Sequence, residues 1–396
     1  MLGLEIYLDN NATTAPLPAV RAAMLETLGP HFGNPSSTHT AGDRARDELH
    51  RARCHVARHL AAAPEQLTFT SCGTEANNLA LHSAMARARS PYLRLVTTNA
   101  EHSSIKKMAE HLRDKKDAEV VPVPVDRKGL VNVEHVKRWA VPGTALVSVH
   151  WVNNETGVIQ PIEQIAELCA ARGVPLHVDA CQALGKLPIN LADLPIDLVT
   201  VTAHKIHGPQ GAAALYARDP DWLVPLFYGG PQENDRRPGT ENVPGIVGFG
   251  AAAEIRARQF DAVVHHLTRL RDQFEDRVRE LVPDVTINGD TNRRACNTTN
   301  LCFHGLDGQA LVARLDQQGV RCSQSSACTN QRPEPSYVLR AMGLSEEDAY
   351  ASIRFSFGVT NTEAEVETAA LLLQQLCGSL RAFASNLHNP YHANRS

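Results

Sequence analysis

The chain has 396 residues, of which 43% are apolar and 21% charged, as in ordinary globular proteins, and this length suggests two or three domains. Its 39 basic and 43 acidic residues leave a net charge of −4, so the composition shows no electrostatic footprint for nucleic acid or an anionic membrane. We see no signal peptide and no apolar stretch long enough to span a membrane, and therefore expect a cytoplasmic protein.

The nine cysteines exclude several classes of protein. Their odd number means that they cannot all pair within one chain, and no C-x-x-C occurs. Zinc-ribbon and thioredoxin-like signatures are therefore absent, and we expect reduced thiols. The cysteines stand at positions 54, 72, 169, 181, 296, 302, 322, 328 and 377.

Between residues 64 and 217, short β-rich runs alternate with amphipathic helical patterns. This alternation predicts a mainly parallel sheet covered by helices, and the continuously apolar runs fit strands that are buried on both faces. The predicted strands are 67–71, 93–99, 120–126, 145–152, 175–179, 197–202 and 211–217, and the predicted helices are 74–87, 103–115, 132–139 and 161–172.

The remainder of the chain predicts a smaller α+β domain. One long helical pattern covers about 243–280, and a final helix covers about 362–386. Between them, the predicted strands 297–304 and 351–357 flank a helix over 309–318. We expect a large domain over 15–257 and a small domain made of 1–14 and 258–396.

Two glycine motifs are weak signals. The segment 245–250 has the reverse of the glycine spacing in dinucleotide-binding loops, and Gly185-Lys186 lacks the Ser or Thr of a P-loop. We interpret both as packing or turn glycines.

A histidine cluster is also weak. His50 and Cys54, and likewise His55 and His59, stand four residues apart in a helical pattern, a spacing that could hold a metal ion. An exposed basic helix is the favoured interpretation, because no fourth ligand closes the set, and we expect no metal site.

Polar residues follow four of the predicted strands. Because open α/β sheets bind ligands at the carboxyl ends of their strands, these segments predict one common site. The four segments are 71–78, 99–104, 177–182 and 202–209.

These segments supply the groups that pyridoxal 5′-phosphate (PLP) requires. Gly73 and Thr74 open a helix and suit a phosphate. His102 can stack on a planar ligand and carry protons. Asp179 can hold a cationic ring nitrogen, and Lys205, which is costly to bury unless it is used, can bind an aldehyde as a Schiff base.

On these residues the sequence resembles the class V aminotransferase superfamily of fold-type I PLP enzymes, and it is similar to the NifS/IscS group of cysteine desulfurases. The resemblance implies a mainly parallel seven-stranded sheet covered by helices, with a smaller α+β domain. It runs in family order over about residues 5–370. Its matching segments are 7–14, 32–37 with His39, 70–75, 101–102, 153–157, 177–182, 203–209, 237–242, 325–328, 335–339 and 352–356.

The resemblance implies these cofactor contacts. Lys205 holds the PLP aldehyde, Asp179 the pyridinium nitrogen and Gln182 the phenolic oxygen, while His102 stacks on the ring. The residues implied at the phosphate are Gly73, Thr74, Thr202, His204 and, from the partner subunit of a homodimer, Thr240.

The resemblance also implies a substrate site. Arg354 pairs with the substrate carboxylate, Asn154 assists near that carboxylate and the cofactor oxygen, and Asn34 contacts the substrate. Cys328 is the nucleophile that takes sulfur from L-cysteine as a persulfide and leaves L-alanine. His102 is the candidate proton carrier.

Cys328 lies in a polar stretch over about 323–335 with little periodicity, which is typical of a mobile loop. Such a loop could carry a persulfide to an acceptor protein. Iron–sulfur scaffolds, tRNA thiolation, nitrogenase maturation and DNA phosphorothioation all remain open destinations. Pairing of Cys322 with Cys328 under oxidation is a further hypothesis.

Two other functions remain open. The same fold could serve an aminotransferase or a selenocysteine lyase, and Cys328 distinguishes them, because a transaminase needs no loop thiol. The chain could also be a non-catalytic interaction protein on a decayed enzyme fold. The intact Lys205, Asp179, His102 and Arg354 argue against that alternative.

Overall fold

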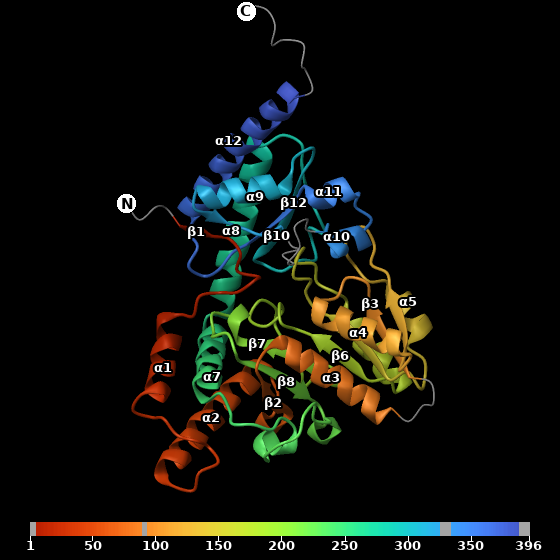
Figure 1. Cartoon of the computed structure of the whole chain (residues 1–396), viewed down its shortest axis with the longest axis vertical. Helices are drawn as coiled ribbons and strands as arrows, with labels where there is room; N and C mark the ends of the chain where they lie inside the picture. Colours follow the sequence, from red (N-terminus) through yellow and green to blue (C-terminus); the bar gives the residue numbers. More distant parts are fainter. Residues whose placement is uncertain (1–4, 89–92, 325–333, 388–396) are drawn as a thin grey trace, which may run out of the picture.

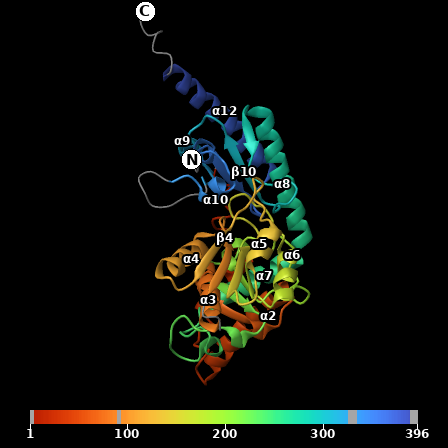
Figure 2. The same ribbon diagram turned by 90° about the vertical axis from the view of Figure 1, so that its right-hand side faces the viewer.

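The computed structural model describes residues 5–387 except 89–92 and 325–333, and for 384–387 only the backbone. Figure 1 shows two parts stacked along the long axis, with the larger sheet and α1–α7 below and α8–α12 above. Figure 2 shows the same division from the side.

The lower part is built on a seven-stranded sheet with the spatial order β2-β8-β7-β6-β5-β3-β4. The strands from β7 to β4 pair in parallel, whereas β8 runs antiparallel to both β7 and β2. The predicted mainly parallel seven-stranded sheet is therefore confirmed. The strands are β2 (Leu67–Thr70), β3 (Arg94–Thr98), β4 (Glu119–Val123), β5 (Leu146–His150), β6 (Leu176–Asp179), β7 (Leu198–Thr202) and β8 (Ala213–Ala217).

Both faces of this sheet are buried, because successive strand residues point to opposite sides. Leu146 and Leu198 pack with α3 and α4 in one apolar cluster, while Val147 and Val199 belong to the main core on the other face. This explains why the strands read as continuously apolar runs. The helices of this part are α1 (Pro18–Leu28), α2 (Thr40–His59), α3 (Gly73–Arg87), α4 (Ser103–Lys115), α5 (Val133–Trp139), α6 (Ile162–Arg172) and α7 (Val243–Arg258).

The histidine-rich segment is a helix, as interpreted, but only one face of it is exposed. The segment belongs to α2, which buries Ala52 and Val56 against α7. A Cβ atom on Gly250 of α7 would lie 2.5 Å from the Ala52 Cα, so this glycine permits the close packing of the two helices. The interpretation of segment 245–250 as packing glycines is confirmed.

The upper part has its own apolar cluster, in which Ile6 and Leu8 from the start of the chain join Phe274, Phe303 and residues of α12. Its sheet has the order β12-β10-β9, and β1 pairs with β11. The elements are β1 (Ile6–Tyr7), α8 (Phe260–Leu281), β9 (Val285–Ile287), β10 (Thr298–Phe303), α9 (Gly308–Gln317), β11 (Val320–Arg321), α10 (Tyr337–Ala341), α11 (Glu346–Tyr350), β12 (Ser352–Ser356) and α12 (Glu363–Leu387).

The predicted long helix over 243–280 is broken in two at Gln259, which has φ −108° and ψ 11°. The reason is that its apolar residues serve two cores. Phe249 and Ala253 of α7 pack under the large sheet, whereas Leu267 and Leu270 of α8 pack in the upper cluster. A single straight helix could not direct the apolar residues of both halves into their separate cores. Our division of the chain into domains at residues 14 and 257 stays a prediction.

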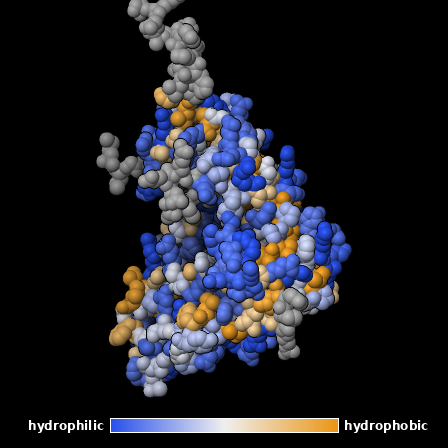
Figure 3. Space-filling model, turned by 45° about the vertical axis from the view of Figure 1, so that its right-hand side comes forward, coloured by the Kyte–Doolittle hydropathy of each residue, from blue (hydrophilic) through white to orange (hydrophobic). Residues whose placement is uncertain are grey.

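Hydrophilic residues cover most of the face seen in Figure 3, with hydrophobic residues gathered in separate patches. Among the described residues, none of the helices combines the length and the apolar character that crossing a membrane requires.

Candidate active site

Lys205 ends a short 3₁₀ helix (Ala203–Lys205) that follows β7, at the edge of the sheet where the parallel strands end. Its Nζ donates hydrogen bonds to the carbonyl oxygens of Asn11 and, at 2.7 Å, of Ala12. Burial, aided by the positive charge of Arg354, lowers the pKa of this amine to about 8. About a tenth of Lys205 is therefore unprotonated at pH 7, far more than for an ordinary lysine, and the unprotonated amine is the form that acts as a nucleophile or proton acceptor.

Asp179 is the last residue of β6 and is 7% exposed. Its carboxylate accepts hydrogen bonds from the Asn77 side chain at 2.8 Å and from the Cys181 backbone N–H at 3.0 Å. Burial alone would raise the pKa of Asp179, but nearby His102 and these hydrogen bonds outweigh it and lower the pKa below its usual value. The site therefore presents a buried, ionised carboxylate that can hold a cation.

Gln182 lies in a buried hydrogen-bond network that shares the Asn11 carbonyl with Lys205. Its Oε1 accepts from the Lys186 amine at 2.6 Å, and its Nε2 donates to the Asn11 carbonyl at 2.9 Å. Because an ammonium or amine hydrogen bond at Oε1 fixes which end of the amide is oxygen, the second N–H of Gln182 is available as a donor. That N–H could donate to an oxygen of the cofactor, and the contact stays a prediction.

The beginning of α3 suits an anion. Gly73 is its first residue, and a Cβ there would lie 2.9 Å from the Cys181 Sγ, so a side chain at this position would push that sulfur aside. Thr74 is exposed at the same helix end, where backbone N–H groups lack carbonyl partners within the helix. These two residues can hold a phosphate as the sequence predicts.

Two further predicted phosphate ligands lie just before Lys205 in the chain. Thr202 is buried at the end of β7, and its hydroxyl donates to the Ala212 carbonyl at 3.3 Å. His204 Nδ1 lies 3.2 Å from the Thr13 hydroxyl. Burial, with the positive charges of Lys205 and Lys186, lowers the pKa of His204 to about 4, so its ring is neutral at pH 7.

His102 caps the start of α4 and is exposed. Its Nδ1 accepts a hydrogen bond from the Ser104 backbone N–H at 3.2 Å. In the neutral ring the proton therefore sits on Nε2. His102 is close enough to Asp179 to lower the carboxyl pKa, which places it beside the predicted cofactor site.

Arg354 of β12 brings the upper part of the molecule to this site. Its guanidinium donates to the Asp9 carboxylate at 2.6 Å and to the Asn154 carbonyl at 3.0 Å, and it is 5% exposed. Its Nε is buried without a hydrogen-bond partner in the described part of the chain. Asp9 immediately precedes the two-residue stretch Asn10-Asn11, so Arg354 and Lys205 both contact the same short N-terminal segment.

Two of the predicted residues, Asn34 and Thr240, are not brought to this cluster. Asn34 is exposed in the loop between α1 and α2, where its Oδ1 accepts from the Ser36 N–H at 2.9 Å. Thr240 is exposed on the segment before α7. Cys328 lies outside the described residues.

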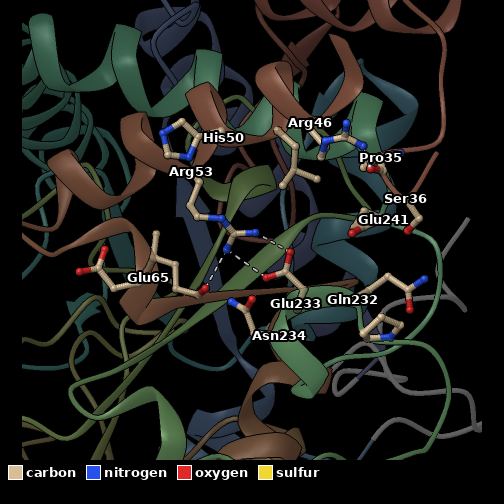
Figure 4. A pocket seen from close by; sticks show the side chains of 13 residues that line it. Pro35, Ser36, Arg46, His50, Arg53, Glu65, Gln232, Glu233, Asn234 and Glu241 are labelled. Atoms are coloured by element: carbon tan, nitrogen blue, oxygen red, sulfur yellow. Dashed lines mark hydrogen bonds and ion pairs between the residues drawn. The ribbon is translucent and has the colours of Figure 1, made fainter. Parts of the chain in front are cut away.

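A pocket of about 380 Å³ lies apart from Lys205, between α2 and the segment 231–241 that precedes α7. In Figure 4, Arg53 and Glu233 point toward each other across it. The Glu233 carboxylate, 3% exposed, pairs with the Arg53 guanidinium at 2.6 Å and accepts the Phe69 N–H at 2.8 Å. Glu233 has φ +49°, so this buried ion pair holds a strained turn in the segment that carries Thr240.

The clustered residues fit PLP. They combine an anion-binding helix end at Gly73, a buried carboxylate at Asp179 and an amine of lowered pKa at Lys205. Those are the partners that a phosphate, a pyridinium and an aldehyde require.

Comparison with known proteins agrees with this geometry. The family model "Aminotransferase class-V" matches residues 6–369. A cysteine desulfurase of Trichormus azollae is 40% identical over 96% of this chain and 94% of its own length. The cysteine desulfurase NifS of Azotobacter vinelandii is 38% identical over 95% of this chain and 94% of its own.

The solved structure titled "NIFS-LIKE PROTEIN" covers 95% of this chain and 100% of its own, with a TM-score of 0.89 and 33% identity. The chain therefore belongs to the class V aminotransferase family, whose members depend on PLP and have the fold-type I architecture.

The structure adds three residues to which sequence reasoning gave no role. Asn77 holds Asp179, Lys186 orients Gln182, and the Asn11 carbonyl receives both Lys205 and Gln182. A signal existed for Lys186 only: a lysine four residues after Gln182 in an otherwise apolar segment is costly to bury without partners. Asn77 and Asn11 act through contacts with residues distant in sequence.

Proposed function

We propose that the chain is a PLP-dependent cysteine desulfurase. In the net reaction, L-cysteine and the Cys328 thiol give L-alanine and a persulfide on Cys328. The C–S bond of the substrate breaks, and an S–S bond to Cys328 forms. The observation that supports it best is the convergence of Lys205 and Arg354, an amine and a guanidinium, on residues 9–12.

That convergence suits an α-amino acid, because Arg354 can pair with its carboxylate and Lys205 can act as a base toward its α-carbon. Bound PLP supplies an electron sink for the negative charge that develops on that carbon. Lys205, with its pKa lowered to about 8, can take and return the proton of that carbon. Asp179 would stabilise a cationic ring nitrogen of the cofactor, and Gln182 would donate a hydrogen bond to its phenolic oxygen.

Arg354 is proposed to bind the substrate carboxylate. Its fork geometry suits two parallel hydrogen bonds to a carboxylate, and Asp9 already satisfies part of that geometry in this structure. Substrate would therefore share or displace the Asp9 contact. The Nε of Arg354, which has no hydrogen-bond partner among the described residues, offers a further donor. Asn154 would orient the guanidinium through its carbonyl oxygen.

A homodimer, with Thr240 reaching the phosphate of the partner subunit, also belongs to the proposal. It is supported by large apolar side chains that a lone chain leaves exposed, at Leu25, Leu28, Phe32 and Phe227. The sulfur acceptor is proposed to be a protein thiol, such as that of an iron–sulfur scaffold. The reaction is proposed to occur in the cytoplasm.

The test is alanine formation from L-cysteine by the PLP-loaded protein, measured with a thiol reductant and without any keto acid. Cys328→Ser should reduce alanine formation to background, while Cys54→Ser, a matched change on α2, should leave it unchanged. Alanine formation that survives Cys328→Ser would contradict the proposal. Turnover that requires a keto acid would indicate an aminotransferase, and turnover of selenocysteine alone would indicate a selenocysteine lyase.

A further inference from the structure

Three potential metal ligands meet at the outer end of β10, in the upper part of the molecule. Cys302 is the fifth residue of that strand, and His304 follows its end. Asp348 comes from α11, which Figure 1 places beside β12 and β10. Their side-chain ligand atoms all lie within 4.8 Å of one another.

The distances in this cluster are specific. Cys302 Sγ lies 3.5 Å from His304 Nδ1 and 3.7 Å from Asp348 Oδ1, and His304 Nδ1 lies 2.7 Å from Asp348 Oδ1. The thiol and the carboxylate thus approach the same ring nitrogen. A catalytic triad needs its nucleophile and its acid on opposite ring nitrogens, so this arrangement cannot relay a proton in that way.

The same distances suit a tetrahedral ion. Bonds of about 2.3 Å to sulfur and about 2.0 Å to nitrogen or oxygen place sulfur about 3.5 Å from the other two ligands, and those two about 3.3 Å apart. The two distances from sulfur already agree. Only the His304–Asp348 pair must open, by about 0.6 Å, when the proton between them is replaced by a metal.

Outer partners hold two of these ligands in the required orientation. The Thr286 hydroxyl lies 2.9 Å from His304 Nε2, so Nε2–H can donate to it and leave the Nδ1 lone pair for a metal. The Ser345 hydroxyl donates to Asp348 Oδ2 at 2.8 Å, which leaves Oδ1 facing the cluster.

Burial divides the site into a closed and an open side. Cys302 is 1% exposed, whereas the side chains of His304 and Asp348 are 40% and 36% exposed. An ion held by the three residues would therefore have one coordination position toward solvent. Sulfur, imidazole and carboxylate together favour Zn²⁺ over the hard cations Mg²⁺ and Ca²⁺.

We propose that Cys302, His304 and Asp348 form a Zn²⁺ site, with Cys302 Sγ, His304 Nδ1 and Asp348 Oδ1 as ligands and water as the fourth. Binding displaces two protons to solvent, that of the thiol and the one between His304 Nδ1 and Asp348 Oδ1, and the thiolate and carboxylate then balance the two charges of the ion. Loss of the thiol proton also removes the hydrogen bond from Cys302 to the Asp348 carbonyl. That carbonyl still accepts a hydrogen bond from the Ser352 hydroxyl at 2.6 Å, so it is not left without a donor.

The experiment uses the full-length PLP-loaded Cys328→Ser protein, so that the proposed reactive thiol cannot bind metal. After chelator treatment, Co²⁺ is titrated as a spectroscopic probe and then displaced by Zn²⁺. The expected result is one Co²⁺ per chain with tetrahedral ligand-field bands and a thiolate charge-transfer band. Absence of that one-equivalent spectrum in protein with a native circular dichroism spectrum would overturn the proposal.

Variants in that background assign the ligands. Cys302→Ser should abolish the charge-transfer band, and Thr286→Val should weaken Zn²⁺ binding about 10- to 100-fold while keeping the band. Cys54→Ser is the matched control, because Cys54 also lies 3.5 Å from a histidine nitrogen, that of His50, but belongs to no three-residue group among the described residues. A band that persists in Cys302→Ser, or disappears in Cys54→Ser, would refute the assignment.

Discussion

The buried amine of Lys186 makes a quantitative prediction about stability. Lys186 is 5% exposed and donates to Gln182 Oε1 and, at 3.2 Å, to Asn11 Oδ1. Burial lowers the pKa of its amine from 10.5 to about 7. The amine can keep both hydrogen bonds as a neutral donor, so deprotonation removes the buried charge without breaking the network.

The sign and size follow from proton linkage. Between pH 7 and 9 the unfolded lysine keeps its proton while the folded one loses it, so the unfolded state binds more protons and stability rises with pH. With a folded pKa of about 7 and about 1.4 kcal/mol per pK unit, the free energy of unfolding should rise by about 2 kcal/mol over this interval. Lys186→Met should lack this contribution.

The assay is urea unfolding of the wild type and Lys186→Met at several pH values from 7 to 9, with the difference between the two proteins as the measured quantity. Lys137→Met, a change in an exposed lysine paired with Glu134, controls for the loss of a positive charge. A wild-type-minus-variant difference that stays constant with pH would refute the reasoning, because it would mean that Lys186 remains charged in the folded protein.

Three further predictions concern the cofactor, the substrate and the strained turn. Asn77→Ala removes a hydrogen bond to the charged Asp179, so PLP affinity measured by fluorescence titration should fall about 10-fold, and an unchanged affinity would contradict that role. Arg354→Lys removes the two parallel donors of the guanidinium, so the KM for L-cysteine should rise at least about 10-fold, by a larger factor than kcat falls. A rise in KM no larger than the fall in kcat would argue against carboxylate binding by Arg354. Arg53→Met leaves the buried Glu233 carboxylate without its cation, so the free energy of unfolding should fall by about 3–5 kcal/mol in urea titrations. A fall below about 1 kcal/mol, as expected for an exposed ion pair, would refute the role of this pair in holding the turn.

The large sheet could be predicted from the sequence because each of its strands is determined by residues that are close together in the chain. Each strand is a short apolar run bounded by turns, and the residues that follow it, such as Asp179 and Lys205, share one edge by topology alone. The break at Gln259 could not be predicted, because both halves of the pattern are helical and only the two separate cores divide them.

The parts of the site that could not be predicted depend on contacts between residues distant in sequence. Asp9 pairs with Arg354, and Asp348 meets Cys302 and His304, through folding that no local spacing records. The spacing of residues along the chain does not indicate the cluster of Cys302, His304 and Asp348, because it joins a strand end to a helix across the fold. The proposed roles of Cys328 and Thr240 stay predictions.

The N-terminal segment affects when the site can form during synthesis. The Asn11 N–H donates to the Ser356 hydroxyl at 2.9 Å across 345 residues of chain, and Asn10 donates to the Ser356 carbonyl. The ribosome must therefore release nearly the whole chain before residues 9–12 find their final position. Lys205 emerges well before that point, so a nascent chain can carry the amine long before the site around it is complete. Productive capture of the cofactor is thus a late event, one that follows the closure of a very long loop.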